Sequence, residues 1–346
     1  MQQTNVQYGP YLQLDAILNA QHPESDKHGM PAHDEMLFIV IHQAYELWFK
    51  QLLFEVESVA DIMSKPAVND NSPELQTVVH RLNRSVSILK LLVQQIDIME
   101  TMTPMDFLDF RDMLRPASGF QSWQFKTLEA RLGLQYENRF GQEYYISQLT
   151  PDKIEIIRRA EREPSVLKLL NDWLERMPFF EEPDNWSDYQ PSTNAATDGG
   201  SLWFNDYRNI YMAGLADAEQ ANRAYFDKVF GDGEGAGHLS PRASRAALFI
   251  MLYRGYPLLQ LPFQLLNSLL EIDEQLSTWR YRHMSMVQRV IGTRIGTGGS
   301  TGRDYLKGAL DKHYIFADIA RLTSFLIERR KLPALSPAMG RRLGFR

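Results

Sequence analysis

Two histidines stand out in this sequence because each lies in an otherwise apolar stripe of a predicted helix. The first stripe recurs at alternating spacings of three and four residues, which is the period of one helical face: Leu269, Ile272, Leu276, Trp279, His283, Met286 and Val290. The second has the same character: Phe38, His42, Tyr45, Phe49, Leu52 and Val56. Such faces point into a core. A buried imidazole there must be hydrogen-bonded, neutralised or coordinated, because an unsatisfied buried polar group is costly.

Two interpretations fit this pair of inward imidazoles. Each histidine can be a core residue bonded to a neighbouring carbonyl, which is the usual state of a buried polar group. Alternatively, two long helices that each carry one inward imidazole provide what a haem enclosed in a helical bundle needs. One ring ligates the iron, and the other lies on the opposite side, where a gas or a substrate reacts.

The remaining histidines are expected outside the core. Polar or Gly-rich surroundings predict loop positions for His22, His28 and His238. His33 stands at a predicted helix start, and polar helical contexts predict that His80 and His313 are exposed.

Composition narrows the class of protein. The chain has 346 residues, no cysteine and a formal net charge of −6. Without cysteine there is no disulfide, thiolate metal site, cysteine nucleophile or covalently attached c-type haem. The basic residues are scattered, which argues against nucleic acid or an anionic membrane as a partner. No apolar run reaches the ~20 residues that span a bilayer, and the N-terminus lacks the layout of a signal peptide. We therefore expect a cytoplasmic protein.

The fold class is predicted to be all-α, a helical bundle. Four Ser-Pro or Thr-Pro pairs mark helix starts, because the first residue caps the helix and proline suits its first turn: 72–73, 103–104, 150–151 and 240–241. Helices are predicted over 34–64, 73–99, 104–114, 122–132, 151–163, 165–177, 205–230, 241–254, 258–291, 304–312 and 315–329. No period-two strand pattern persists. We expect a single domain over 1–346 with an insertion-like section at about 150–238.

Two further segments carry polar groups suited to a ligand. Arg111 shares a helical face with Phe107 and Leu114, and its guanidinium fork suits a carboxylate. An internal salt bridge with Asp109 or Glu35 is the alternative. The Gly-rich segment 296–302 matches neither GxGxxG nor GxxxxGK[ST] and follows a helix, so a nucleotide site is disfavoured. It is either a loop that closes over a ligand or a plain connector.

Three long blocks resemble the signature blocks of the tryptophan 2,3-dioxygenase family. They are HDEMLFIVIHQAYELWFKQL (33–52), FRDMLRPASGFQSWQF (110–125) and the segment 279–302, which begins WRYRHM and ends GTGGSTG. YGPYLQLD (8–15) resembles the N-terminal arm of that family, and PFQLLNSLLEID (262–273) is similar as well. The likeness is strong over about 8–134 and 240–335, and weak between them.

The resemblance implies an all-helical homotetramer that binds one haem b per subunit and oxidises L-tryptophan with O₂ to N-formyl-L-kynurenine. It implies that His283 is the axial iron ligand, that Ser118 and Gly119 lie near the haem, and that the catalytic His42 hydrogen-bonds the indole N–H.

The resemblance also implies the remaining substrate contacts. Phe38 would flank the indole ring, Arg111 would pair with the substrate carboxylate, and Thr297 would bond its ammonium and carboxylate end. The arm residues Tyr8, Tyr11 and Leu12 would reach into a neighbouring subunit's pocket. Some members have a tyrosine where this chain has Phe107. The hydroxyl contact is then lost, and Arg111 carries more of the anchoring.

The sequence is also compatible with two other functions. A non-catalytic haem protein, such as a gas sensor or carrier, needs His283 but has no use for Arg111 or Thr297. A haem enzyme of the same fold could instead oxygenate another indole substrate. The joint presence of Phe38, His42, Arg111 and Thr297 favours the dioxygenase.

Overall fold

The computed structural model describes residues 5–66, 68, 72–142, 146–177, 185–186, 188–195, 202–231, 233, 235–292, 294 and 303–344. These residues form helices and connecting segments, with no strand among them. The α-helices are α1 (Tyr8–Leu12), α2 (Leu14–Leu18), α3 (Glu24–Lys27), α4 (His33–Met63), α5 (Pro73–Met99), α6 (Pro104–Arg111), α7 (Trp123–Leu132), α9 (Pro151–Arg162), α10 (Val166–Glu175), α11 (Leu202–Gly214), α12 (Asn222–Phe230), α13 (Pro241–Leu252), α14 (Pro257–Ile291), α15 (Arg303–Lys312), α16 (Ala317–Arg321) and α17 (Pro337–Leu343). The short 3-10 helices are η1 (Asp112–Leu114), η2 (Gly119–Gln121), η3 (Tyr136–Asn138), η5 (Asp217–Glu219), η6 (Leu322–Phe325) and η7 (Arg329–Lys331). The all-α prediction is confirmed.

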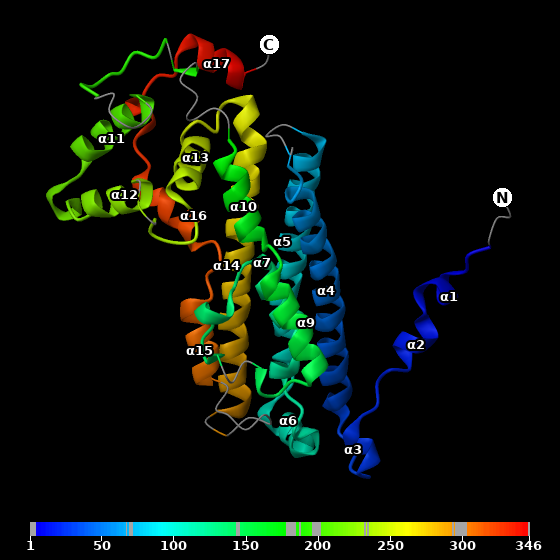
Figure 1. Cartoon of the computed structure of the whole chain (residues 1–346). Helices are drawn as coiled ribbons and strands as arrows, with labels where there is room; N and C mark the ends of the chain where they lie inside the picture. The colour runs from blue at the N-terminus through cyan, green and yellow to red at the C-terminus, as the bar shows by residue number, and fades with distance from the viewer. Residues whose placement is uncertain are drawn as a thin grey trace.

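Three long helices, α4, α5 and α14, form the centre of the molecule (Figure 1). Helices α4 and α5 are antiparallel, because Glu55 pairs with Arg84 while Tyr45, ten residues earlier, donates to the carbonyl of Leu92. Helices α5 and α14 are parallel, because Asn83 accepts from Ser268 and Asp97 pairs with Arg282. The start of α4 and the ends of α5 and α14 therefore meet at one end of the bundle, beside α6 (Figure 1).

Local capping explains where several of these helices begin. The side chains of Ser72, Thr103 and Ser240 each accept a hydrogen bond from a backbone N–H of the first turn, with proline as the first helical residue. Thr103 forms a complete capping box with Asp106, whose carboxylate accepts from the Thr103 N–H. Satisfying N–H groups that the helix leaves open stabilises its start, and the starts predicted at 73, 104, 151 and 241 are confirmed.

The buried side chains form one large cluster and one small one. The large cluster draws members from α4 to α17 and includes residues of α10, α11 and α12. Trp203 of α11, for example, stacks on Trp186 and meets Phe249 of α13 edge to face. The small cluster lies where α4, α5 and α6 meet and contains Ile41, Met99, Met102, Phe107 and Phe110. This second cluster forms part of the candidate site.

Two predicted helices are wrong. The segment 205–230 is not one helix, because α11 ends at Gly214 and the Glu219 carboxylate accepts the Ala216 N–H, which starts η5. The segment 315–329 holds only the short helices α16 and η6 and the first residue of η7. There the Tyr207 and Tyr211 hydroxyls donate to the carbonyls of Phe325 and Ser324, so tertiary partners replace a continued helix.

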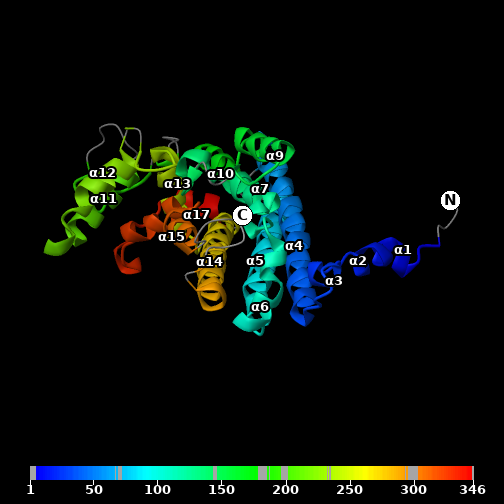
Figure 2. The ribbon, with the colours of Figure 1, turned by 90° about the horizontal axis from the view of Figure 1, so that it is seen from below.

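The N-terminal helices α1 and α2 project from the body of the molecule in both views (Figures 1 and 2). Their aromatic side chains are exposed, Tyr8 by 76% and Tyr11 by 73%. Among the described helices, none is both long and apolar enough to cross a membrane.

Candidate active site

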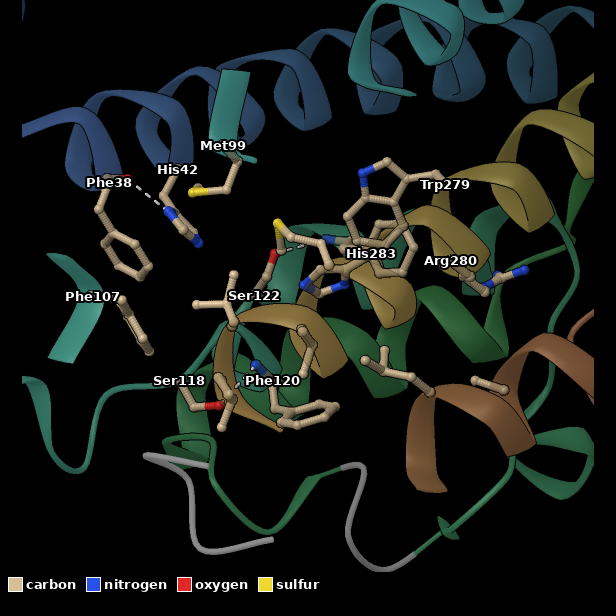
Figure 3. Close-up of a pocket in the computed structure, with 18 of the residues that line it drawn as sticks. Phe38, His42, Met99, Phe107, Ser118, Phe120, Ser122, Trp279, Arg280 and His283 are labelled. Atoms are coloured by element: carbon tan, nitrogen blue, oxygen red, sulfur yellow. Dashed lines mark hydrogen bonds between the residues drawn. The ribbon is translucent and has the colours of Figure 1, made fainter. Parts of the chain in front are cut away.

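A cavity of about 230 Å³ lies at the end of the bundle where α4, α5, α6 and α14 meet (Figure 3). It is far larger than the roughly 10–15 Å³ that one water needs. Most of its wall is apolar or aromatic, including Phe38, Met99, Phe107 and Trp279, and both histidines of the apolar stripes line it. The sequence-based expectation that His42 and His283 face a common space is confirmed.

His283 lies on α14 with its ring half-buried against the cavity wall. Its Nδ1 atom is buried and has no hydrogen-bond partner among the described residues. Burial, with a smaller contribution from the neighbouring His42, lowers the pKa of His283 to about 4. The ring is therefore neutral near pH 7 and keeps a nitrogen lone pair, the form of imidazole that binds a metal.

His42 lies on α4, and its Nδ1 atom is 2.7 Å from the carbonyl oxygen of Phe38, one helical turn earlier (Figure 3). A carbonyl can only accept, so Nδ1 carries the proton and Nε2 is left as an acceptor. Burial lowers the pKa of His42, against the opposing effects of the Phe38 carbonyl and Glu46. The site thus presents a neutral imidazole whose free nitrogen accepts a hydrogen bond.

Aromatic rings form the wall beside His42. The Phe38 ring centroid lies 4.1 Å from the His42 ring, 5.8 Å from Phe107 in a stacked arrangement, and 5.6 Å from Phe110 edge to face. Met99 and Met102, at the end of α5, complete this wall. Rings arranged in this way accommodate a flat apolar ligand.

The opposite part of the cavity is charged. Glu129 of α7 accepts from Arg139 and from Arg280, each at 2.6 Å, and both arginines are buried. Burial is the largest influence on the Glu129 pKa and raises it, but Arg139, His313 and Arg280 together hold the pKa well below its usual value. Burial lowers the pKa of nearby Lys126 to about 8, and the Lys126 ammonium donates to the Phe120 carbonyl at 2.6 Å.

His313 belongs to this charged part, and the prediction that it is exposed is wrong. Its exposed fraction is 2%, it lines the cavity, and its Nε2 accepts the Phe140 N–H at 3.0 Å. Arg280 donates to the His313 carbonyl, which holds the end of α15 against α14. The polar neighbours in sequence, Asp311 and Lys312, are themselves exposed and concealed this burial.

The comparisons with known proteins agree over almost the whole chain. The sequence model of a family described as tryptophan 2,3-dioxygenase matches residues 1–326. The tryptophan 2,3-dioxygenase of Alteromonas mediterranea is 45% identical, with 98% of this chain and 97% of that protein covered. That of Bdellovibrio bacteriovorus is 43% identical with 98% of each covered, and that of Dictyostelium discoideum 41% identical with 99% and 89% covered. The chain belongs to the tryptophan 2,3-dioxygenase family.

Within this family member, six of the residues singled out from sequence line one cavity: Phe38, His42, Phe107, Ser118, Gly119 and His283. Ser118 caps η2, since its hydroxyl accepts the Phe120 N–H, and this holds Ser118 and Gly119 at the cavity wall. Sequence reasoning did not place Met99, Met102, Lys126 or Glu129 here. The parallel arrangement of α5 and α14, which brings Met99 to the site, leaves no local signal in the sequence.

The other predicted residues lie elsewhere or outside the description. Arg111 is buried at the end of α6 and is not among the residues that line the cavity. Glu35, one proposed partner, accepts the backbone N–H groups of Glu24 and Ser25, and Asp109, the other, is exposed. Tyr8, Tyr11 and Leu12 lie on the projecting arm. Thr297 lies outside the described residues.

Proposed function

We propose that this protein is a tryptophan 2,3-dioxygenase, which inserts both atoms of O₂ across the indole C2–C3 bond of L-tryptophan to give N-formyl-L-kynurenine. This reaction is the first step of tryptophan catabolism by the kynurenine route. The observation that carries the proposal is the pairing of two neutral imidazoles on one largely apolar cavity in a chain of this family. The family membership favours this function over a non-catalytic haem carrier.

We infer that the cofactor is haem b, held by His283. The residues present fit such a group, because a neutral imidazole lines an apolar cavity and its other nitrogen is buried in the protein. Among the described residues, no three His, Asp or Glu side chains are grouped to hold a metal ion. A porphyrin supplies its own ring of nitrogen ligands, so a single imidazole from the protein is enough to hold its iron. Bound there, beside Ser118 and Gly119, the haem supplies the activation of O₂.

His42 binds and orients the indole in this proposal. Its Nε2 accepts the indole N–H, because Nδ1–H is held by the Phe38 carbonyl one turn earlier. That same hydrogen bond restricts rotation of the ring, so the acceptor is positioned before the substrate arrives. Phe38 and Phe107 flank the indole and exclude water from it.

The amino acid end of the substrate is assigned to Arg111 and Thr297. Arg111 lies four residues after Phe107 on α6, on the same face of the helix. Its guanidinium is buried, and a carboxylate forms a bidentate, charge-assisted pair with a guanidinium. We assign the carboxylate to Arg111 and the ammonium and carboxylate end to Thr297; because Phe107 has no hydroxyl, Arg111 carries more of the anchoring.

We further propose that the enzyme is a homotetramer in which the arm of one subunit enters the site of its neighbour. The arm carries exposed apolar side chains, among them Tyr8, Tyr11 and Leu12, on short helices that project from their own chain. Exposed aromatic residues grouped on one segment are typical of a contact surface.

The function is tested by an assay with L-tryptophan and O₂ as the substrates. The haem-loaded protein is reduced without oxygen and then given L-tryptophan and air, while the near-ultraviolet absorbance of N-formylkynurenine and the O₂ concentration are recorded. We expect product to accumulate with equimolar uptake of O₂. Bound haem without product would exclude this activity on tryptophan, and absence of haem binding would remove the cofactor assignment.

A further inference from the structure

Among the described residues, none forms with the His283 ring the hydrogen bond that usually orients a metal-binding histidine. Such a histidine normally donates its second N–H to a carboxylate or a carbonyl, which fixes the plane of the ring and makes it a stronger ligand. In the described part of the chain, His283 Nδ1 is buried with no such acceptor. Within the described part of the chain, the contacts that restrain this ring are packing contacts.

Trp279 is the side chain that packs on it. It lies one turn before His283 on α14, and side chains four residues apart on a helix meet on one face. The two ring centroids are 5.0 Å apart, and the ring planes are inclined by 35° (Figure 3). The indole therefore packs against the imidazole ring.

Trp279 is itself held by side chains of two other helices, α4 and α7. Phe125 of α7 lies 5.0 Å from its ring, and Tyr45 and Phe49 of α4 meet it edge to face at 6.1 and 6.5 Å. The Tyr45 hydroxyl donates to the Leu92 carbonyl of α5 at 2.9 Å, which fixes Tyr45 in turn. The orientation of the indole is thus determined by the packing of α4, α5, α7 and α14.

We propose that Trp279 is a positioning residue that sets the imidazole plane of His283, and through it the strength and direction of the axial bond to the cofactor. The proposal rests on the proposed function, since it takes His283 as the axial ligand. The groups that surround an axial ligand are one of the means by which a protein tunes a haem. Here an aromatic contact with Trp279 takes the orienting role that a hydrogen bond usually has.

The test compares substitutions in the haem-loaded enzyme by resonance Raman spectroscopy of the ferrous state and by the midpoint potential. Trp279→Leu keeps an apolar side chain but removes the ring. We expect its iron–histidine stretching band to shift and broaden, its potential to change, and haem affinity to fall about 10-fold to 100-fold, the range for loss of groups that orient metal ligands. Trp279→Phe restores a ring and should return the band toward that of the unaltered enzyme.

The matched control is Tyr281→Leu, which removes an aromatic ring from the same helix at a position that is 54% exposed. It should leave band, potential and affinity unchanged. If Trp279→Leu does not fold, Phe49→Leu replaces it, since Phe49 supports the Trp279 edge without lining the cavity. It should shift the same band by a smaller amount.

The outcomes separate this inference from the function on which it rests. A wild-type band that persists in His283→Ala would remove the axial ligand assignment itself. A wild-type band that disappears in His283→Ala but is unchanged in Trp279→Leu, or in Phe49→Leu where that variant replaces it, would overturn the role of Trp279 alone.

Discussion

His42 Nδ1 lies 2.7 Å from the carbonyl oxygen of Phe38, and this contact decides which imidazole nitrogen is available to a ligand. The proton stays on Nδ1, and Nε2 accepts. The same residue that flanks the indole in our proposal thus also selects the tautomer of His42. In the proposed site, Phe38 and His42 would therefore recognise the indole together.

His42 should determine how the enzyme discriminates between tryptophan and 1-methyltryptophan. His42→Leu removes the acceptor for the indole N–H. We therefore expect kcat/KM for tryptophan to fall by the factor that corresponds to the loss of one hydrogen bond, about 0.5–1.5 kcal/mol. 1-Methyltryptophan has no such N–H to donate, so its kcat/KM should fall less in the same variant. The ratio of kcat/KM for the two substrates is the measurement. An unchanged ratio would contradict the acceptor role.

The pKa of His283 predicts an acid-sensitive apo-protein. That pKa is about 4 in the fold against 6.5 when unperturbed. Between these values the unfolded chain binds the proton and the folded chain does not, so stability is lost as pH falls from 6.5 towards 4. The loss attributable to His283 is on the order of 3 kcal/mol. Urea unfolding of haem-free protein across this range measures it.

The matched variant for this measurement is His283→Leu, which has no proton to gain in this window. Its unfolding free energy should depend less steeply on pH than that of the unaltered apo-protein. A residual slope is expected from His42, whose pKa is also lowered by burial. Equal slopes for the two proteins would show that His283 is already accessible to protons in the fold.

Arg111 should act on substrate affinity more than on the fold of the cavity. Arg111→Ala loses a charge-assisted interaction of about 1.5–3 kcal/mol with the substrate carboxylate. Arg111→Lys keeps the charge but not the bidentate fork, so it should recover only part of the loss. The measurement compares KM for tryptophan with KM for tryptamine, which lacks the carboxylate, in each variant. A loss as large for tryptamine as for tryptophan would remove Arg111 from carboxylate binding.

The features predicted correctly from sequence are those set by local chemistry. The Ser-Pro and Thr-Pro starts of α5, α6, α9 and α13 were identified because a cap and its partners lie within one turn. The inward faces of His42 and His283 were identified because helical period is local as well.

The features that were missed depend on partners distant in sequence. The buried His313 accepts hydrogen bonds at Nε2 from the Phe140 N–H and at its carbonyl from Arg280, and both partners are far away in the chain. The helix predicted over 315–329 stops early because the Tyr207 and Tyr211 hydroxyls donate hydrogen bonds to the carbonyls of Phe325 and Ser324. No local pattern carries either contact, so periodicity alone could not find them.

Glu129 is expected to be critical for stability, because its removal deprives the buried Arg280 and Arg139 of the carboxylate that both contact at 2.6 Å, and leaves Arg139 with Glu161 at 3.6 Å. Breaking a buried pair in this way costs about 3–5 kcal/mol. Glu129→Gln keeps the shape and removes the charge that faces Arg139 and Arg280. Glu155→Gln makes the same change in an exposed pair with Arg162 and should destabilise the fold far less, because solvent screens an exposed ion pair. Urea unfolding of both variants is the measurement, and similar losses would argue against a structural role of the buried network.

The arm provides the sharpest test of the assembly. If Tyr8, Tyr11 and Leu12 complete a neighbour's site, a chain with all three changed to alanine should bind haem but lose activity. A His42→Ala chain should be impaired for a different reason. Mixed during assembly, the two inactive chains form sites that combine an intact His42 from one subunit with an intact arm from the other. Activity should then reappear in the mixture.

Recovery of this kind is possible only when the arm acts between subunits. An arm that folded back onto its own chain would leave each site with one defect, and mixing would restore nothing. Joint expression of the two chains, with separation of mixed assemblies by two affinity tags, makes the comparison quantitative. The projecting arm, with Tyr8 and Tyr11 about three quarters exposed, gives the reason to expect recovery.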